Sequence, residues 1–514
     1  MPATSQTRRM RSLAVGFKRG CAHLGDRGRR SILLPLTATP LAPERRGAVH
    51  LLRAALIVRV LRAVRGLVLA RLLLPDVFGA YAVIGALVGP LASLSNLGLT
   101  PLVARDPAPS DRLLAGAAWL NRVAAGTAAG LLVTGVVVWS LASGRAGLLA
   151  PGIAVALATA LYVVPQVDLG ILQGKRRFGD LARVDVAFDA VWTVVALALA
   201  VATRSGWALA GAELAAQAAR ALLARRLAGS RPAAAREAVR EARVGRFAAA
   251  SVAGTALWST VFAAPAWLLQ LETDLRTIGA FALAYTYGQL VALTLGGVAG
   301  RVALPALGAA PAAERVARAW RYSESLSLAL APATALLFVA GPPLLVVAAG
   351  PAWAASGEVL AILVWGMAAR VVFPFGILSQ AAGKPGLDNW VAVTTLAVYG
   401  VLVGPGWTGA SRAAWYVAGT DVLLVVATTS IAPRLFGGRF AGHGALATWA
   451  AAAVAAVVAV AVPGPEGPLL NTLVRTGTCL VAYAAGAALV PAVRRRYAVE
   501  ARSALATARA ALSP

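Results

Sequence analysis

The sequence predicts an all-α polytopic membrane protein with about fourteen transmembrane helices. Of its 514 residues, 59% are hydrophobic and 13% are charged, which is about half the charged share of a soluble domain. From Leu51 onward the chain is a series of long apolar runs divided by short polar breaks. This composition excludes a soluble globular protein and a disordered chain. The runs are continuous and far longer than the alternating segments of about 10 residues that form a transmembrane β-barrel, so helices are expected.

Each apolar run is taken as one span, because about 20 apolar residues of helix cross the hydrocarbon core. In chain order, the predicted spans are residues 51–74, 78–104, 114–142, 148–172, 184–203, 206–224, 247–270, 276–299, 323–349, 357–381, 389–405, 412–432, 444–462 and 469–491.

The longest polar break inside the apolar region is residues 225–246, a predicted basic cytoplasmic linker. Six runs precede it and eight follow it. The chain therefore divides into an N-lobe over residues 51–224, a C-lobe over residues 247–432 and a final pair of helices over residues 444–491. No break is long enough to hold an independent catalytic domain.

The two ends of the chain are predicted to be tails. Residues 1–50 are rich in Arg, and their apolar pieces are short or interrupted by Pro, so we expect a disordered basic cytoplasmic tail and no signal peptide. Residues 492–514 follow the last apolar run and open with the basic cluster Arg494–Arg496. We expect them to form a second cytoplasmic tail.

The formal net charge of +27, from 48 Lys and Arg against 21 Asp and Glu, is explained by membrane topology. If the N-terminus is cytoplasmic, alternate breaks place the basic clusters on one side, including residues 175–177, 225–246 and 301–322. The opposite breaks hold few arginines and several acids. This is the positive-inside pattern of a plasma-membrane protein with both termini in the cytoplasm. It requires an even number of spans and argues against a nucleic-acid partner.

The sequence offers no enzyme motif. Cys21 and Cys479 lie far apart, and the three histidines lie outside the apolar runs, so no metal or disulfide site is expected. The chain lacks the nucleotide-binding motif G-x-x-x-x-G-K-[ST] and any Asp-x-Asp pair. A membrane glycosyltransferase would be expected to carry an acidic metal-binding cluster in a sizeable loop. We therefore expect no catalytic residue, no metal and no cofactor.

Five segments in order carry a family pattern. They are RVLRAVRGLVLARLLLPDVFGAYAVIGALVGPLASLSNLGLTPLVARD (59–106), GILQGKRRFGDLARVDV (170–186), GWALAGAELAAQAARALL (206–223), GPAWAASGEVLAIL (350–363) and SQAAGKPGLDN (379–389). The first contains Ala70-Arg71-Leu72, Phe78-Gly79 and Asn96-Leu97-Gly98-Leu99, with Asn96 where an acid is usual. Together they resemble the oligosaccharide flippases, the Wzx-type polysaccharide transporters of the multidrug/oligosaccharidyl-lipid/polysaccharide exporter superfamily.

The resemblance covers about residues 60–495 and implies a fold and an activity. The implied fold is two six-helix lobes around a central cavity, with two extra helices. The implied activity is transfer of undecaprenyl-pyrophosphate-linked oligosaccharide from the cytoplasmic to the outer leaflet by alternating access, often coupled to an ion gradient. Membrane lipids, a polysaccharide polymerase and glycosyltransferases would be its partners. A lipid II flippase and a multidrug exporter of the same superfamily are the nearest alternatives.

Arginines in the spans are the candidate substrate-binding residues. Ionisable groups at membrane depth usually face a cavity or a partner. Arg62 and Arg65 lie three residues apart in the first span and so share one side of a helix. They predict a cationic wall for the pyrophosphate, since guanidinium groups suit phosphate oxygens. Arg71 and Arg370 are assigned to the same role, although Arg71 near the outer end is equally suited to extend into the headgroup layer.

Acids in the spans are the candidate ion-coupling residues. They are Asp189 and Glu213 in the first lobe and Asp421 in the second. For either first-lobe acid, burial would favour the protonated form. Because Asp421 and Arg370 both belong to the second lobe, they could pair. Such a pair is either a coupling or gating element or a structural ion pair between neighbouring helices.

Overall fold

The computed structural model describes residues 43–95, 97–104, 109–142, 144, 146–229, 232–241, 244–308, 310–384, 386–465, 467–491, 493–500 and 502. The chain divides into two compact units, one of Ala42–Arg494 and one of Met1–Leu41 with Arg495–Pro514. Most of the second unit, including the predicted tail up to residue 42, lies outside the described residues. The predicted spans all belong to the first unit.

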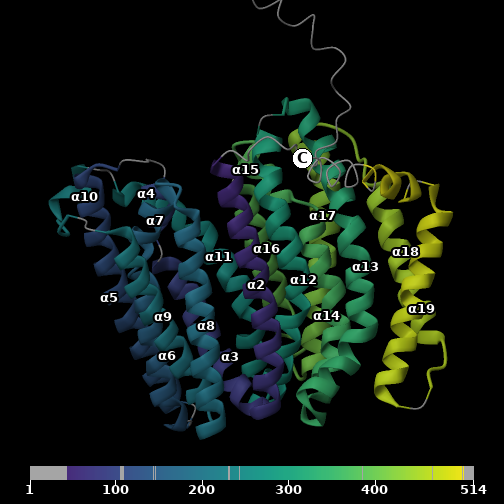
Figure 1. The fold of residues 1–514 in the computed structure, drawn as a ribbon, viewed down its shortest axis with the longest axis horizontal. Coiled ribbons are helices and arrows are strands. Elements are labelled where there is room, and N and C mark those ends of the chain that lie inside the picture. Colours follow the sequence, from purple (N-terminus) through teal and green to yellow (C-terminus); the bar gives the residue numbers. More distant parts are fainter. Residues whose placement is uncertain are drawn as a thin grey trace, which may run out of the picture. The chain divides into compact units, whose positions relative to one another are not determined.

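Every predicted span is helical in the structure (Figure 1). The helices of the first half are α2 (Pro43–Leu72), α3 (Pro75–Ser95), α4 (Leu99–Ala104), α5 (Asp111–Ala142), α6 (Leu149–Val163), α7 (Gln166–Gly174), α8 (Phe178–Thr203), α9 (Trp207–Ala228) and α10 (Glu237–Glu241). The helices of the second half are α11 (Val244–Gln270), α12 (Leu275–Gly308), α13 (Arg315–Ala349), α14 (Ala354–Val372), α15 (Phe375–Ala381), α16 (Gly386–Val401), α17 (Ala410–Phe436), α18 (His443–Ala461) and α19 (Pro468–Leu489). Short 3₁₀ turns cover Ala146–Leu148, Ala312–Glu314 and Pro351–Trp353.

Three predicted single spans are each built from two consecutive helices. The break between α6 and α7 falls at Pro165, and the break between α14 and α15 falls at Pro374. Proline has no backbone N–H to donate, which favours an interruption at both positions. Between α3 and α4, Leu97 and Gly98 adopt positive φ values of 53° and 63°, a left-handed conformation that ends a helix.

The all-helical polytopic fold class is confirmed. Ten candidate spans in the described part of the chain are long and apolar enough to cross a membrane, and no strand occurs there. The predicted spans outside this set are α2, α9, α11 and α16. Of these, α2 is interrupted by arginines, and α16 has only 16 residues.

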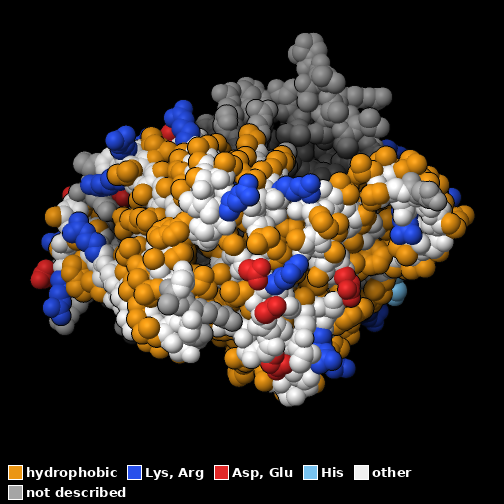
Figure 2. Space-filling model, turned by 90° about the horizontal axis from the view of Figure 1, so that it is seen from below, with side chains coloured by type: hydrophobic (Ala, Val, Ile, Leu, Met, Phe, Trp, Pro, Cys, Tyr) orange, Lys and Arg blue, Asp and Glu red, His pale blue; other side chains and the backbone are white. Residues whose placement is uncertain are grey.

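Figure 2 shows the end of the molecule at which α2 ends and α3 begins, where acidic and basic side chains lie together within a largely apolar surface. The exposed charged residues of the breaks predicted to face outward include Asp76, Glu272, Asp274, Arg276 and Glu358. At this end Asp274 caps α12, because its Oδ1 accepts the backbone N–H of Thr277 at 2.8 Å.

Helices α3 and α12 cross with their backbones in direct contact. A Cβ atom added to Gly79 would overlap the carbonyl oxygen of Leu275, and one added to Gly279 would overlap that of Pro75. Each glycine therefore meets the residue four positions before the other. This reciprocal contact joins the first half of the chain to the second, and only glycine allows it.

Helix α2 also touches both halves of the chain. It packs along α8 of the first half. From the second half, the Tyr287 hydroxyl donates to the carbonyl of Ala63 at 2.7 Å, and the Trp353 indole donates to the carbonyl of Ala70 at 2.7 Å. Small residues on this side of α2, including Gly66 under the Tyr287 hydroxyl, leave its backbone accessible.

The largest buried cluster joins the two halves as well. It contains Ala70 of α2 and Val83 of α3 together with large side chains such as Phe281, Trp353 and Trp407. At the other extreme of the chain, α18 and α19 pack on each other and on α13 (Figure 1). The division into lobes at residues 51–224, 247–432 and 444–491 remains a prediction.

Candidate functional site

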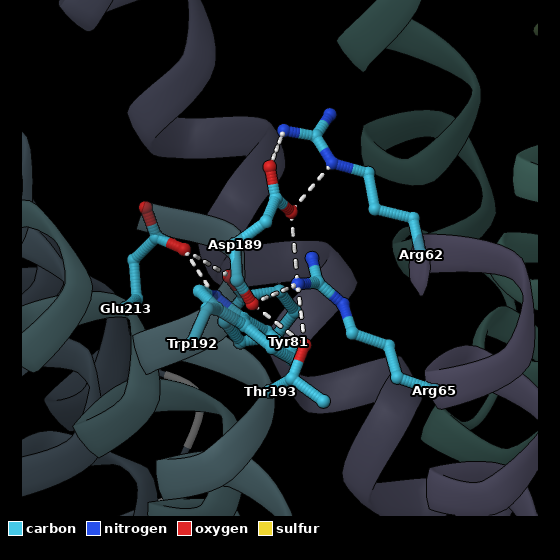
Figure 3. Close-up of polar contacts among 7 residues, drawn as sticks. All are labelled: Arg62, Arg65, Tyr81, Asp189, Trp192, Thr193 and Glu213. Carbon is cyan, nitrogen blue, oxygen red and sulfur yellow. Dashed lines mark hydrogen bonds and ion pairs between the residues drawn. The ribbon is translucent and has the colours of Figure 1, made fainter. Parts of the chain in front are cut away.

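The candidate site is built where α2 lies against α8. Arg62 and Arg65 lie on the side of α2 that faces α8, and Asp189 of α8 lies opposite them (Figure 3). The Asp189 side chain is 1% exposed, that of Arg65 is 11% exposed and that of Arg62 is 45% exposed. Side-chain exposure therefore increases across the site, from the buried Asp189 carboxylate to the half-exposed Arg62 guanidinium.

Asp189 is shared between the two arginines. Arg62 binds it in a two-point contact, with Nε 2.8 Å from Oδ1 and Nη2 2.8 Å from Oδ2. Arg65 reaches the same Oδ1 through Nη1 at 2.9 Å. Two positive charges thus surround one negative charge, and this ion cluster carries a net charge of +1.

Arg65 is held more firmly than Arg62. Its Nη1 also donates to the Thr193 hydroxyl at 3.2 Å and to the Asp189 carbonyl at 3.3 Å. Its guanidinium carbon lies 4.0 Å from the centre of the Trp192 ring, a cation–π contact. Arg65 therefore positions the cluster, while the Arg62 side chain binds Asp189 and stays half exposed.

Glu213 of α9 lies beside the cluster and is bound by neutral donors. Its Oε2 accepts the Trp192 indole N–H at 2.7 Å and the Tyr81 hydroxyl at 3.5 Å, and its Oε1 accepts the Gln217 amide at 2.9 Å. Its surroundings thus differ from those of Asp189, which is ion-paired twice (Figure 3).

The structure therefore brings together four predicted site residues that come from three helices, Arg62, Arg65, Asp189 and Glu213. Arg71, the fifth prediction in this half, is separate from them. It lies in the last turn of α2, is exposed, and has its Nη1 3.0 Å from the point where a Cβ on Gly350 would sit.

The second-half prediction also forms a contact. Arg370 of α14 binds Asp421 of α17, with Nε 2.9 Å and Nη2 2.7 Å from Oδ1. The side chains are 10% and 1% exposed, and the Arg370 guanidinium lies 4.9 Å from the Phe262 ring centre. The pair lines a cavity of about 80 Å³ that also contains Asp388.

Sequence reasoning missed Trp192, Thr193 and Tyr81. The first two follow Asp189 by three and four residues on α8, so helical spacing alone could have placed them beside it. Tyr81 comes from α3 and carried no comparable signal. Among the described residues, no three His, Cys, Asp or Glu side chains gather as metal ligands would.

Comparison with known proteins places this geometry in context. Residues 68–358, more than half of the chain, match the family described as "Polysaccharide biosynthesis protein". No curated protein matches the sequence.

Solved structures share the fold at low sequence identity. A lipid II flippase, MurJ, in an inward closed conformation aligns with a TM-score of 0.66 at 10% identity over 86% of this chain and 98% of its own. An inward-facing multidrug resistance MATE family transporter of the MOP superfamily aligns with a TM-score of 0.60 at 13% identity, over 72% and 92%. A MATE structure in a bent conformation aligns with a TM-score of 0.51 at 13% identity, over 80% and 98%.

Proposed function

Since the chain belongs to the polysaccharide biosynthesis protein family and has the fold of MOP superfamily transporters, we propose that it is a flippase for undecaprenyl-pyrophosphate-linked oligosaccharide. It carries this lipid from the cytoplasmic to the outer leaflet of the cell membrane by alternating access. Both of its termini lie in the cytoplasm. Glycosyltransferases supply its substrate, and a polysaccharide polymerase acts on its product.

The observation that carries this proposal is the cluster of two arginines on one carboxylate. A guanidinium at membrane depth is costly unless it is paired, and Asp189 neutralises only one of the two. Arg62 is half exposed, so it can turn its planar donors toward an anion while Arg65 keeps Asp189 in place. A diphosphate supplies the oxygen acceptors that match these donors.

Charge placement also supports ion coupling. The candidates are Asp189, Glu213 and Asp421. Asp189 and Asp421 each have a guanidinium within 3 Å, so each carboxylate is held in an ion pair. Glu213 receives hydrogen bonds from the neutral side chains of Trp192 and Gln217, and we assign it the role of proton carrier. Arg370 and Asp421 then form a second, buried charged contact of the transport pathway.

The test is flipping of a polyprenyl-pyrophosphate oligosaccharide by the purified protein in liposomes. We expect Arg62→Ala to reduce the rate at least tenfold without loss of folded protein, and Arg62→Ala with Arg65→Ala to abolish it. Arg122→Ala is the matched control, because Arg122 is an exposed span arginine outside the cluster. Full activity of the double variant would refute the proposal.

A lipid II flippase is a second candidate, because the MurJ fold covers most of this chain. Its substrate also carries a polyprenyl pyrophosphate, so the same cluster would serve it. A competition experiment with lipid II distinguishes the two candidate functions. Excess lipid II should leave flipping of the oligosaccharide lipid unchanged in the first case and suppress it in the second.

A further inference from the structure

We propose that Trp192 is a positioning residue that connects Glu213 to Arg65, so that a proton on Glu213 loosens the arginine cluster and strengthens its hold on a diphosphate. This inference rests on the proposed function and adds regulation to the same site. The supporting observation is that the buried Trp192 indole contacts two charged groups. Its edge contacts the Glu213 carboxylate, and its face contacts the Arg65 guanidinium.

Trp192 makes its two contacts with different parts of the ring. The N–H at its edge donates to Glu213 Oε2 at 2.7 Å, and Arg65 lies 4.0 Å above the face. The residue is 7% exposed, so both contacts are shielded from water. The direction of the indole N–H fixes the plane of the ring, and the ring plane determines where the Arg65 guanidinium can stack.

The charge on Glu213 decides how firmly that plane is held. A hydrogen bond to a carboxylate is about twice as strong as one between neutral groups. When a proton binds Oε2, the group becomes a neutral acid, and the indole loses its charged acceptor. Trp192 can then rotate, and its ring no longer holds the Arg65 guanidinium against Asp189.

The electrostatic change acts in the same direction. With Glu213 ionised, the two arginines and the two acids sum to zero, and with Glu213 protonated they sum to +1. An anionic ligand is therefore bound better after protonation. By linkage, diphosphate binding also favours proton uptake on Glu213.

The charged and titratable groups around Glu213 come from three helices. Helix α3 contributes Tyr81, α8 contributes Asp189 and also Asp185, which interacts with Arg62, and α2 contributes Arg62 and Arg65. The remaining helices that pack on α9 are α6 and α7. The titratable side chain of α6 is Tyr162, which lies against Arg220, and that of α7 is Asp168, which lies 3.5 Å from Arg225.

The first test needs no ligand. The difference between the tryptophan spectra of the wild type and of Trp192→Phe isolates Trp192 among the 13 tryptophans, and ultraviolet resonance Raman reports the strength of its N–H hydrogen bond. We expect this signal to titrate with pH, to stop titrating in Glu213→Gln and to change in Arg65→Lys. A signal that does not titrate overturns the proposal, whatever the substrate is.

The second test measures the affinity for inorganic pyrophosphate against pH. We expect the wild type to bind about tenfold tighter when Glu213 is protonated, and Glu213→Gln to bind tightly at every pH. Trp192→Phe keeps a ring under Arg65 but has no N–H, so its pH dependence should fall to about twofold.

Tyr81→Phe is the matched control for the second test. It removes a different and longer hydrogen bond to Glu213, at 3.5 Å, and it should retain most of the pH dependence. An undiminished pH dependence in Trp192→Phe would show that Glu213 acts through space and would overturn the role of Trp192. Unchanged pyrophosphate binding in Arg62→Ala would instead count against the proposed function.

Discussion

Asp189 is a buried acid whose position is determined by two arginines from another helix. Its side chain is 1% exposed, so the charges of Asp189, Arg62 and Arg65 are stabilised by one another and not by water. Removing one member of a buried ion cluster leaves the others unpaired, which usually destabilises a protein by several kcal/mol. Stability and the proposed ligand binding are therefore linked at this residue.

We predict that Asp189→Asn lowers the free energy of unfolding by about 3 kcal/mol, seen as a lower midpoint of thermal unfolding in detergent. Asp180→Asn is the control, because Asp180 pairs with Arg177 and Arg183, which are 42% and 75% exposed. Exposed pairs contribute about 0–1 kcal/mol. Equal shifts for the two variants would contradict the prediction.

Part of the site could be predicted from the sequence at this scale. Arg62 and Arg65 were identifiable because charge is rare in apolar runs, and their spacing placed them on one helical side. Their pairing with Asp189 was not predictable, because it joins residues 127 and 124 positions apart. The pairing of Arg370 with Asp421 was open to prediction, since each is an isolated charge in the same group of spans.

Helix α3 shows how an element is fixed by one close crossing. Its Gly79 meets α12 at Gly279 with no room for a side chain. Elsewhere along α3, Gly85 has open space where a Cβ would sit. The same helix thus carries one glycine that packing requires and another that it does not.

Gly79→Ala should lower the free energy of unfolding by about 1–3 kcal/mol, because the added methyl group forces the two helices apart. Gly85→Ala is the matched control on the same helix. It should be neutral or stabilising by up to about 1 kcal/mol, since alanine favours helix. Thermal unfolding of both variants measures the difference, and a neutral Gly79→Ala would show that the crossing is looser than described.

Element positions were largely predictable, and element breaks were not. Each of the fourteen ranges predicted from apolar length lies on helix, and ten of them are candidate spans in the described part of the chain. It could not show that the runs at 148–172 and 357–381 contain two helices each, because Pro165 and Pro374 interrupt hydrogen bonding without reducing hydropathy. The close approach of Gly79 to Gly279 could not be predicted either, because it joins distant segments and nothing in the composition around either glycine indicates it.

At the scale of the whole molecule, the charges in the breaks between spans predict its orientation in the membrane. The proposed topology places the basic breaks in the cytoplasm and the mixed acidic and basic breaks outside. The helix α16 offers a direct test, because exposed residues flank it on both sides, Lys384 before it and Thr408 after it.

We expect a membrane-impermeant maleimide to label Thr408→Cys in intact cells and to label Lys384→Cys only after permeabilisation. Both variants are made in a chain without Cys21 and Cys479. The reverse pattern would invert the topology and place both termini outside.

The attachment of α2 to the second half of the chain has a consequence for substitutions in this helix. Tyr287 and Trp353 bind the main-chain carbonyls of Ala63 and Ala70, and every amino acid supplies that carbonyl. The side chains of α2 that face α8 are not part of this joint, so a substitution among them leaves the joint in place as long as the small residues stay small. One side of α2 thus forms a seam that depends on its backbone, while the other side forms charged contacts that depend on its side chains.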